Sequence, residues 1–198
     1  MTMLELVKHL NFAVVVLFTL LYLYQGFYVV VGLVRRRWQD RHQPSRLHRF
    51  AVIVSARNEE GVIGELLESL NRQNYPKELR DLYVVADNCT DDTAGVARRA
   101  SAFVYERFDQ VHKGKGYAMD YLFRRLKEEG KDCYDGYFVF DADNLVDANF
   151  VAEMNRTFDQ GYDAVTCYRN SKNFAANWIS AGYSIWFLRE ARFLNFPR

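Results

Sequence analysis

The sequence predicts an α/β domain with a Rossmann-like, mostly parallel sheet flanked by helices, preceded by one transmembrane helix. Two observations carry this prediction. An uncharged, apolar run extends from Leu10 to Val34, and after it short apolar runs alternate with segments whose apolar residues recur at helical spacing. Such alternation is typical of parallel strands joined by right-handed helical crossovers.

The apolar run near the amino terminus is long enough for a membrane span, because about 20 apolar residues cross a bilayer. Glu5 precedes the run and three consecutive arginines follow it, whereas a cleaved signal peptide has a basic leader and a shorter apolar core. We therefore predict a retained transmembrane anchor over residues 1–34 and a basic juxtamembrane linker over residues 35–49.

Charges on the two sides of this run differ. Lys8 lies ahead of it, whereas residues 35–50 carry six arginines against Asp40. Because Lys and Arg favour the cytoplasmic side, we expect a cell-membrane protein whose main domain is cytoplasmic. The basic linker fits the anionic headgroups of membrane lipids, which are therefore an expected partner.

The composition of the main domain excludes one class of partner and indicates a redox state. Residues 51–198 are net acidic, although the whole chain has a net charge of +1, so we expect no binding to nucleic acid, which usually requires a basic face. Cys89, Cys133 and Cys167 are odd in number, far apart and without C-x-x-C spacing. Reduced structural thiols are the expectation for a cytosolic domain.

The elements of the domain follow in order from residue 50. Strands are predicted at residues 50–54, 82–86, 102–105, 138–140 and 164–168. The first predicted helix has an apolar face that includes residues from Val62 to Leu70. Three more helices are predicted, from a cap at Thr90–Thr93 to about Ala100, from Gly116 to Glu129, and from Asp147 to about Phe158. The order strand, helix, strand is expected to give a domain over residues 50–170.

Residues 171–198 form a final, aromatic-rich segment. Aromatic side chains from Phe174 to Phe196 are interleaved with Arg189, Glu190 and Arg192. This composition suits an amphipathic helix lying against lipid headgroups, and ordinary packing against the sheet explains it nearly as well.

The strand predicted at 138–140 leads directly into Asp141, Ala142 and Asp143. Ligands of parallel sheets bind beyond the carboxyl ends of the strands, and Mg²⁺ or Mn²⁺ usually takes one or two carboxylates while substrate phosphates and water complete its shell. The pattern is compatible with a metal site for a diphosphate-bearing substrate, although Asp-x-Asp is short and does not by itself favour a metal over a turn or a cap. A turn or a helix cap is the alternative, whereas a helix-loop-helix calcium site is excluded because Leu145 and Val146 occupy positions that require Asp or Asn and Gly.

Polar residues also follow the other strands. Asn58 and Glu59 follow the first strand, where they could instead cap a helix, and Asp87 ends the second, where an Asx turn is as good an interpretation. Lys113-Gly114-Lys115-Gly116 opens the helix before the Asp-x-Asp strand, and its amides and lysines suit an anion at a helix N-terminus. A solvated loop is the alternative, and the spacing of a P-loop is absent.

Taken in order, four motifs make the sequence resemble family 2 glycosyltransferases over about residues 50–170. The motifs are Val52-Ile53-Val54-Ser55-Ala56-Arg57-Asn58-Glu59-Glu60, Asp87-Asn88-Cys89-Thr90-Asp91-Asp92-Thr93, Lys113-Gly114-Lys115-Gly116 and Asp141-Ala142-Asp143. The resemblance implies the GT-A fold, a nucleotide-sugar donor such as a UDP-sugar, Mg²⁺ or Mn²⁺, and transfer with inversion. The membrane anchor is similar to those of cellulose, hyaluronan and poly-N-acetylglucosamine synthases.

The resemblance also implies roles for individual residues. Ala56, Asn58 and Glu59 would line the nucleotide site, and Asp87 would contact the base. Lys115, with Lys113 as the weaker candidate, would neutralise the diphosphate. Asp141 would lie near the ribose or the metal, and Asp143 would bind the cation directly.

The sequence departs from the family pattern downstream of Asp-x-Asp. The acidic motif that supplies the general base and the Q-x-x-R-W motif are absent, so we expect the base beyond Arg198 and the domain to be truncated. The leading hypothesis is a membrane-anchored inverting transferase acting on a polysaccharide or lipid-linked acceptor, including a polyprenyl phosphate. A non-catalytic nucleotide-sugar-binding or assembly module is the alternative. A nucleotidyltransferase is disfavoured because no Gly-rich triphosphate loop follows the first strand.

Overall fold

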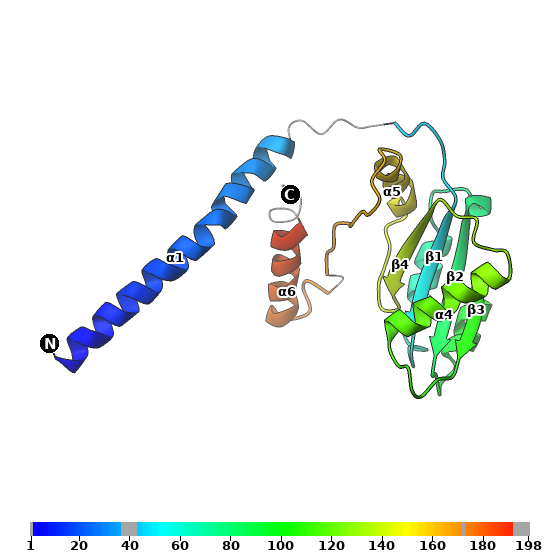
Figure 1. Ribbon diagram of the computed structural model, residues 1–198, viewed down its shortest axis with the longest axis horizontal. Helices are drawn as coiled ribbons and strands as arrows, with labels where there is room; N and C mark the ends of the chain where they lie inside the picture. Colours follow the sequence, from blue (N-terminus) through cyan, green and yellow to red (C-terminus); the bar gives the residue numbers. More distant parts are fainter. Residues whose placement is uncertain (1, 37–42, 172, 192–198) are drawn as a thin grey trace. The chain divides into compact units, whose positions relative to one another are not determined.

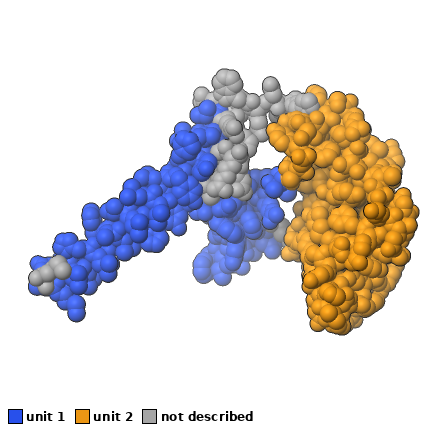
Figure 2. Space-filling model, viewed as in Figure 1, with its two compact units in different colours: residues 1–41, 166–198 blue, residues 42–165 orange. Residues whose placement is uncertain are grey.

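The computed structural model describes residues 2–36, 43–171 and 173–191. The chain divides into two compact units, one of residues 1–41 and 166–198 and the other of residues 42–165 (Figure 2). The middle of the predicted basic linker, at 37–42, and the end of the aromatic segment, at 192–198, lie outside the described residues.

The first unit contains the apolar helix α1, Met3–Arg36, and the shorter helix α6, Trp178–Arg189. The stretch Met3–Val34 of α1 is long and apolar enough to cross a membrane, which agrees with the predicted helix. α6 begins after Asn177, whose side chain accepts a hydrogen bond from the Ser180 amide. Its apolar residues are spread around the helix rather than gathered on one side, which differs from the amphipathic pattern expected for residues 171–198.

The second unit is built on a parallel sheet of four strands in the order β3-β2-β1-β4 (Figure 1). The strands are β1, Phe50–Ala56; β2, Arg80–Asp87; β3, Phe103–Arg107; and β4, Gly136–Asp141. The helical segments are α2, Ile63–Asn71; the short 3-10 helix η1, Lys77–Leu79; α3, Thr93–Arg99; α4, Lys115–Glu128; and α5, Phe150–Phe158. The predicted parallel α/β fold is confirmed.

Helices cover both faces of the sheet because β1 and β2 have apolar side chains on both sides. On one face Val52 and Val54 pack with α2, α3 and α5, through residues that include Leu66, Leu67, Ala97 and Val151. On the other face α4 covers the sheet (Figure 1), and its Ala118, Leu122 and Leu126 pack with Ala51, Ile53, Tyr83 and Val85. Both faces of the central strands are therefore closed, as expected for a parallel sheet.

β4 differs from the fully buried strand that its apolar sequence predicts. Phe138 and Phe140 are buried, but the alternate residues Tyr137 and Val139 are 41% and 42% exposed. The reason is position: β4 pairs only with β1 among the described strands, and α4 packs mainly on β1, β2 and β3. The consequence for the site is that Asp141 projects to the exposed side of the sheet.

The strand predicted at residues 164–168 is wrong. These residues form no strand in the described part of the chain, and four of the five are exposed. Their β-branched and aromatic composition favours a strand only where a neighbouring strand offers hydrogen bonds and a surface to pack on, and none of the four strands found in the described residues pairs with them.

The predicted helix caps also need correction. α5 begins at Phe150 after Asn149, and Asp147 instead accepts a hydrogen bond from the Asn149 amide in a local turn. α2 begins at Ile63, so neither Asn58 nor Glu59 caps it with its side chain. The predicted boundaries placed these helices about one turn too early.

Candidate functional site

The loops that follow β1 and β2 are cross-linked at the carboxyl edge of the sheet. Asn58 lies in the left-handed region with φ of 56°, and its Oδ1 accepts hydrogen bonds from the Thr90 amide at 2.8 Å and the Thr90 hydroxyl at 3.3 Å. The Glu59 amide donates to Thr93 Oγ1 at 2.8 Å. Glu60 Oε2 accepts from the Asp92 amide at 2.7 Å. The two loops therefore form one rigid surface.

Ala56 and Cys89 lie beneath this surface. Ala56 is only 2% exposed, and its carbonyl accepts a hydrogen bond from Cys89 Sγ at 3.5 Å. Cys89 Sγ in turn accepts from the Asn58 amide at 3.5 Å. Cys89, Cys133 and Cys167 are free cysteines; Cys89 is half-buried, whereas Cys133 and Cys167 are exposed rather than part of the core.

Asp87 lies at the end of β2. The resemblance predicts a carboxylate that is open to a ligand, but the residue is buried. Its Oδ1 accepts hydrogen bonds from Arg107 Nη1 at 2.6 Å and from Asn88 Nδ2 at 3.0 Å. The Asp87 and Arg107 side chains are 5% and 8% exposed. One carboxylate oxygen is thus committed to a buried ion pair, which leaves the other for any role toward a ligand.

The lysine loop meets the Asp-x-Asp motif at the same edge. Lys115 is the first residue of α4 and follows Gly114, whose φ of 118° is strained for any other residue. Lys115 Nζ lies 2.5 Å from Asp141 Oδ1, and the two side chains are 43% and 66% exposed. Residues 113–117 with Asp120 line a cavity of about 420 Å³ beside this pair. The carboxylate of Asp141 and two lysines of one loop therefore share an open, solvated region.

The charge at the start of α4 is unusual for a helix. Helix N-termini carry a partial positive charge and favour acidic residues, yet the first turn of α4 holds Lys115 and no acid. A lysine there costs stability and adds to a positive field that suits an anion.

The Asp-x-Asp motif alternates across the sheet edge. Ala142 is 4% exposed and packs in the core, whereas Asp141 and Asp143 are both exposed on either side of it. The Asn144 side-chain amide donates to Asp143 Oδ1 at 3.2 Å. Two open carboxylates fit Mg²⁺ or Mn²⁺, which needs few protein ligands when phosphates and water supply the rest. Consistent with so open a site, no three acidic, His or Cys side chains cluster as a closed metal cage among residues 2–36, 43–171 and 173–191.

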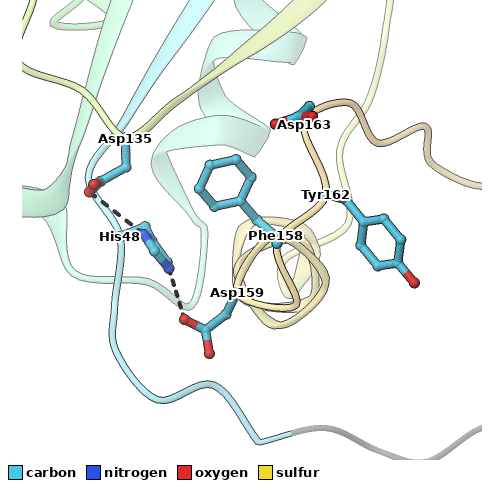
Figure 3. A pocket seen from close by; sticks show the side chains of 7 residues that line it. His48, Asp135, Phe158, Asp159, Tyr162 and Asp163 are labelled. Atoms are coloured by element: carbon cyan, nitrogen blue, oxygen red, sulfur yellow. Dashed lines mark hydrogen bonds and ion pairs between the residues drawn. The ribbon is translucent and has the colours of Figure 1, made fainter.

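A second hollow, of about 360 Å³, lies at the opposite, amino edge of the sheet and holds His48, Asp135 and Asp159 (Figure 3). His48 is 6% exposed, and its Nε2 lies 2.9 Å from Asp159 Oδ1. Arg46 Nη2 lies 3.0 Å from Asp135 Oδ1, and the Ser45 amide donates to Asp159 Oδ2 at 2.6 Å. These contacts hold the end of the predicted linker against the domain, and the Arg46 guanidinium is paired with the carboxylate of Asp135.

Of the residues singled out from the sequence, the structure brings Lys115, at the start of α4, into contact with Asp141, at the end of β4, and Asp143 follows two residues later in the loop after β4. Lys113 lines the same cavity. Asn58 and Asp87 lie at the same edge with side chains bonded to protein groups, and Glu59 is held there through its backbone amide. Arg107 and Asp109 were not among the residues singled out, although both follow the strand predicted at residues 102–105 within four residues, which was a signal that polar groups gather there too.

Comparison with known proteins places the chain in a family. The model of "Glycosyltransferase like family 2" matches residues 48–195. The procollagen galactosyltransferase 1-B of Xenopus laevis is 28% identical over 131 residues, covering 56% of this chain and 21% of its own length. The 4,4'-diaponeurosporenoate glycosyltransferase of Staphylococcus aureus is 41% identical over 85 residues, covering 43% and 19%. The chain thus spans about a fifth of the length of these curated relatives.

Among solved structures, a mannosyltransferase of Pyrobaculum calidifontis in complex with GDP-Man and Mn²⁺ superimposes with a TM-score of 0.56 at 21% identity. The match covers 80% of this chain and 48% of the mannosyltransferase chain. The likeness confirms the GT-A fold that the sequence predicts. With three quarters of its length matched by the family model, the chain belongs to glycosyltransferase family 2.

Proposed function

We propose that this chain is the donor-binding part of a membrane-anchored glycosyltransferase that uses a nucleotide-sugar, with UDP-sugars as the first choice. The single observation that carries the proposal is the contact between Lys115 Nζ and Asp141 Oδ1 at 2.5 Å, which joins the glycine-rich loop to the Asp-x-Asp motif. Both groups are exposed and lie at the carboxyl edge, where parallel sheets bind ligands. Family membership supports the same chemistry.

Each residue at this edge has a distinct role in the proposal. Lys115, helped by Lys113 and the amino end of α4, stabilises the negative charge that develops on the departing nucleoside diphosphate. Asp141 and Asp143 hold Mg²⁺ or Mn²⁺, which when bound adds further neutralisation of the diphosphate. The rigid surface formed by Ala56, Asn58 and Glu59 lines the nucleotide site. Asp87 offers its remaining oxygen to the base.

The acceptor side of the proposal rests on α1 and on the relatives. α1 is long and apolar enough to cross a membrane. In the proposal it anchors the protein and leaves the second unit in the cytoplasm, where a growing glycan or a lipid-linked acceptor is within reach. The transfer proceeds with inversion, which requires a general base to remove the proton of the acceptor hydroxyl. A purely binding role is the alternative that the experiment has to separate.

The experiment is a panel of calorimetric titrations of UDP, GDP and ADP, each with and without an attached sugar, into the full chain in detergent micelles with Mn²⁺. The proposal predicts saturable binding with a clear preference for one nucleotide. Slow release of free sugar from the preferred donor would indicate transferase chemistry, whereas nucleotide-sugar binding without release or transfer of the sugar would favour the non-catalytic module. Absence of binding to all six ligands by a folded protein would contradict the proposal.

A further inference from the structure

The residue that the proposed function leaves unexplained is Arg107, which lies at the carboxyl end of β3. Its guanidinium is buried between two carboxylates, with Nη1 at 2.6 Å from Asp87 Oδ1 and Nη2 at 2.9 Å from Asp109 Oδ2. Nη2 also donates to the carbonyl of His112 at 2.6 Å. One side chain therefore connects the end of β2, the end of β3 and the loop that leads to the lysines.

Asp109 shapes that loop. Its Oδ1 accepts hydrogen bonds from the amides of Val111 and His112, both at 2.9 Å. These two hydrogen bonds, of which the one from the His112 amide has the larger effect, lower the pKa of Asp109 to about 2. The carboxylate thus stays charged and folds residues 109–112 into a fixed turn around itself.

Asn88 closes the network from the side of β2. Its backbone lies in the left-handed region with φ of 55°, and its Oδ1 accepts from the Asp109 amide at 2.9 Å and from Gln110 Nε2 at 3.1 Å. Its Nδ2 donates to the Asp109 carbonyl at 3.0 Å and to Asp87 Oδ1 at 3.0 Å. The turn is therefore held by Asn88 and Arg107 together, and Lys113 and Lys115 follow it within a few residues.

We propose that Arg107 is a positioning residue for donor binding: it fixes the Lys113–Lys115 loop and orients Asp87 without contacting the donor itself. This inference rests on the proposed function of the lysine loop. The guanidinium is 8% exposed and its contacts are internal, so it cannot serve as a direct phosphate ligand in this arrangement. Its fork geometry bonds two carboxylates and a carbonyl at once, which a lysine cannot reproduce.

The test is a double-mutant cycle between Arg107→Lys and Lys115→Met, read by calorimetric titration of UDP with Mn²⁺ into the full chain. Arg107→Lys alone should weaken UDP binding about tenfold, because the loop that carries the lysines is no longer fixed. In the Lys115→Met background the same change should weaken UDP binding by clearly less than tenfold, because one of the groups that Arg107 positions is already missing while Lys113 and Asp87 remain. A role in general folding would instead give losses that add.

Hydrogen exchange supplies a second readout that needs no ligand. The amides of Val111 and His112 should lose protection in Arg107→Lys while the amides of β1 and β2 keep theirs. Arg98→Gln is the matched control, because it removes an arginine that pairs with Glu106, the neighbour of Arg107, at an exposed position. The control should leave both UDP affinity and loop protection unchanged.

Each outcome has a defined meaning. Wild-type-like UDP binding by Arg107→Lys, additive losses in the cycle, or unchanged exchange at Val111 and His112 would overturn the positioning role while leaving the proposed function intact. Failure of the wild-type chain itself to bind any nucleotide would overturn the proposed function and the positioning role together.

Discussion

Replacing Lys115 by Met separates the function of this side chain from its contribution to stability. The Lys115–Asp141 pair is 43% and 66% exposed, so its loss costs less than about 1 kcal/mol of folding free energy. The lysine is also unfavourable by about 0.3–1 kcal/mol at the N-terminus of α4, where it opposes the helix dipole. These two terms oppose each other, so the free energy of unfolding should change by no more than about 0.5 kcal/mol.

Donor affinity should respond much more strongly. A charge-assisted hydrogen bond to a phosphate contributes about 1.5–3 kcal/mol, so the dissociation constant for UDP in Mn²⁺ should rise by about ten- to a hundredfold. The measurements are calorimetric titration of UDP and thermal unfolding of the same detergent-solubilised protein. The methionine keeps the length and apolar stem of the lysine, so the change is confined to the charge.

Lys127→Met is the matched control, since Lys127 is exposed in the last turn of the same helix. There the cation favours the helix dipole, so this variant should lose a little stability and keep its affinity for UDP. If Lys115→Met binds UDP like the wild type, or loses affinity only in proportion to a loss of folded protein, the assignment of this lysine to the donor site is wrong.

Three further predictions follow from other contacts. Asp143→Asn should abolish the dependence of UDP binding on Mn²⁺ while leaving the melting temperature unchanged, and a variant that keeps full Mn²⁺ dependence would remove Asp143 from the metal site. Asn155→Ala should lower the free energy of unfolding by about 2–4 kcal/mol, because the buried His48 amide and Arg46 carbonyl lose their partner; a loss below about 0.5 kcal/mol in thermal unfolding would show that water replaces it. The pKa of Asp109 is depressed from 3.8 to about 2, so its contribution to stability is present above pH 3.8 and is lost as the pH falls toward 2. Wild type should accordingly lose more free energy of unfolding across that range than Asp109→Asn. Equal losses in the acid unfolding of the two proteins would contradict the prediction.

The central strands and their helices could be predicted because their patterns are local. The apolar runs at residues 50–54 and 82–86 fall inside β1 and β2, and the predicted helix at 116–129 differs from α4 by one residue at each end. In each case the apolar residues of one segment specify a buried surface by themselves. Predicting a strand at 164–168 failed because a strand also needs a partner, which its own residues do not reveal.

The polar residues at the carboxyl edge of the sheet could be named from the sequence, but the contacts between them could not. The roles of Lys115, Asp141 and Asp143 at a donor site stay a prediction; these residues were singled out by the order of the motifs and by the resemblance to family 2 glycosyltransferases. The ion pair that Asp87 makes with Arg107 could not be predicted, since 20 residues separate the two and only the pairing of β2 with β3 brings them together. Sequence patterns name the groups at a sheet edge, whereas the register of the strands decides which of them are free.

The most direct test of the donor site is a titration of UDP into the full chain in Mn²⁺, repeated after EDTA and with Asp143→Asn. We expect saturable binding of UDP in Mn²⁺ that is lost both on chelation and in the variant. Binding of equal strength in EDTA, or in Asp143→Asn with Mn²⁺, would show that the Asp-x-Asp edge does not hold the metal and nucleotide as proposed here.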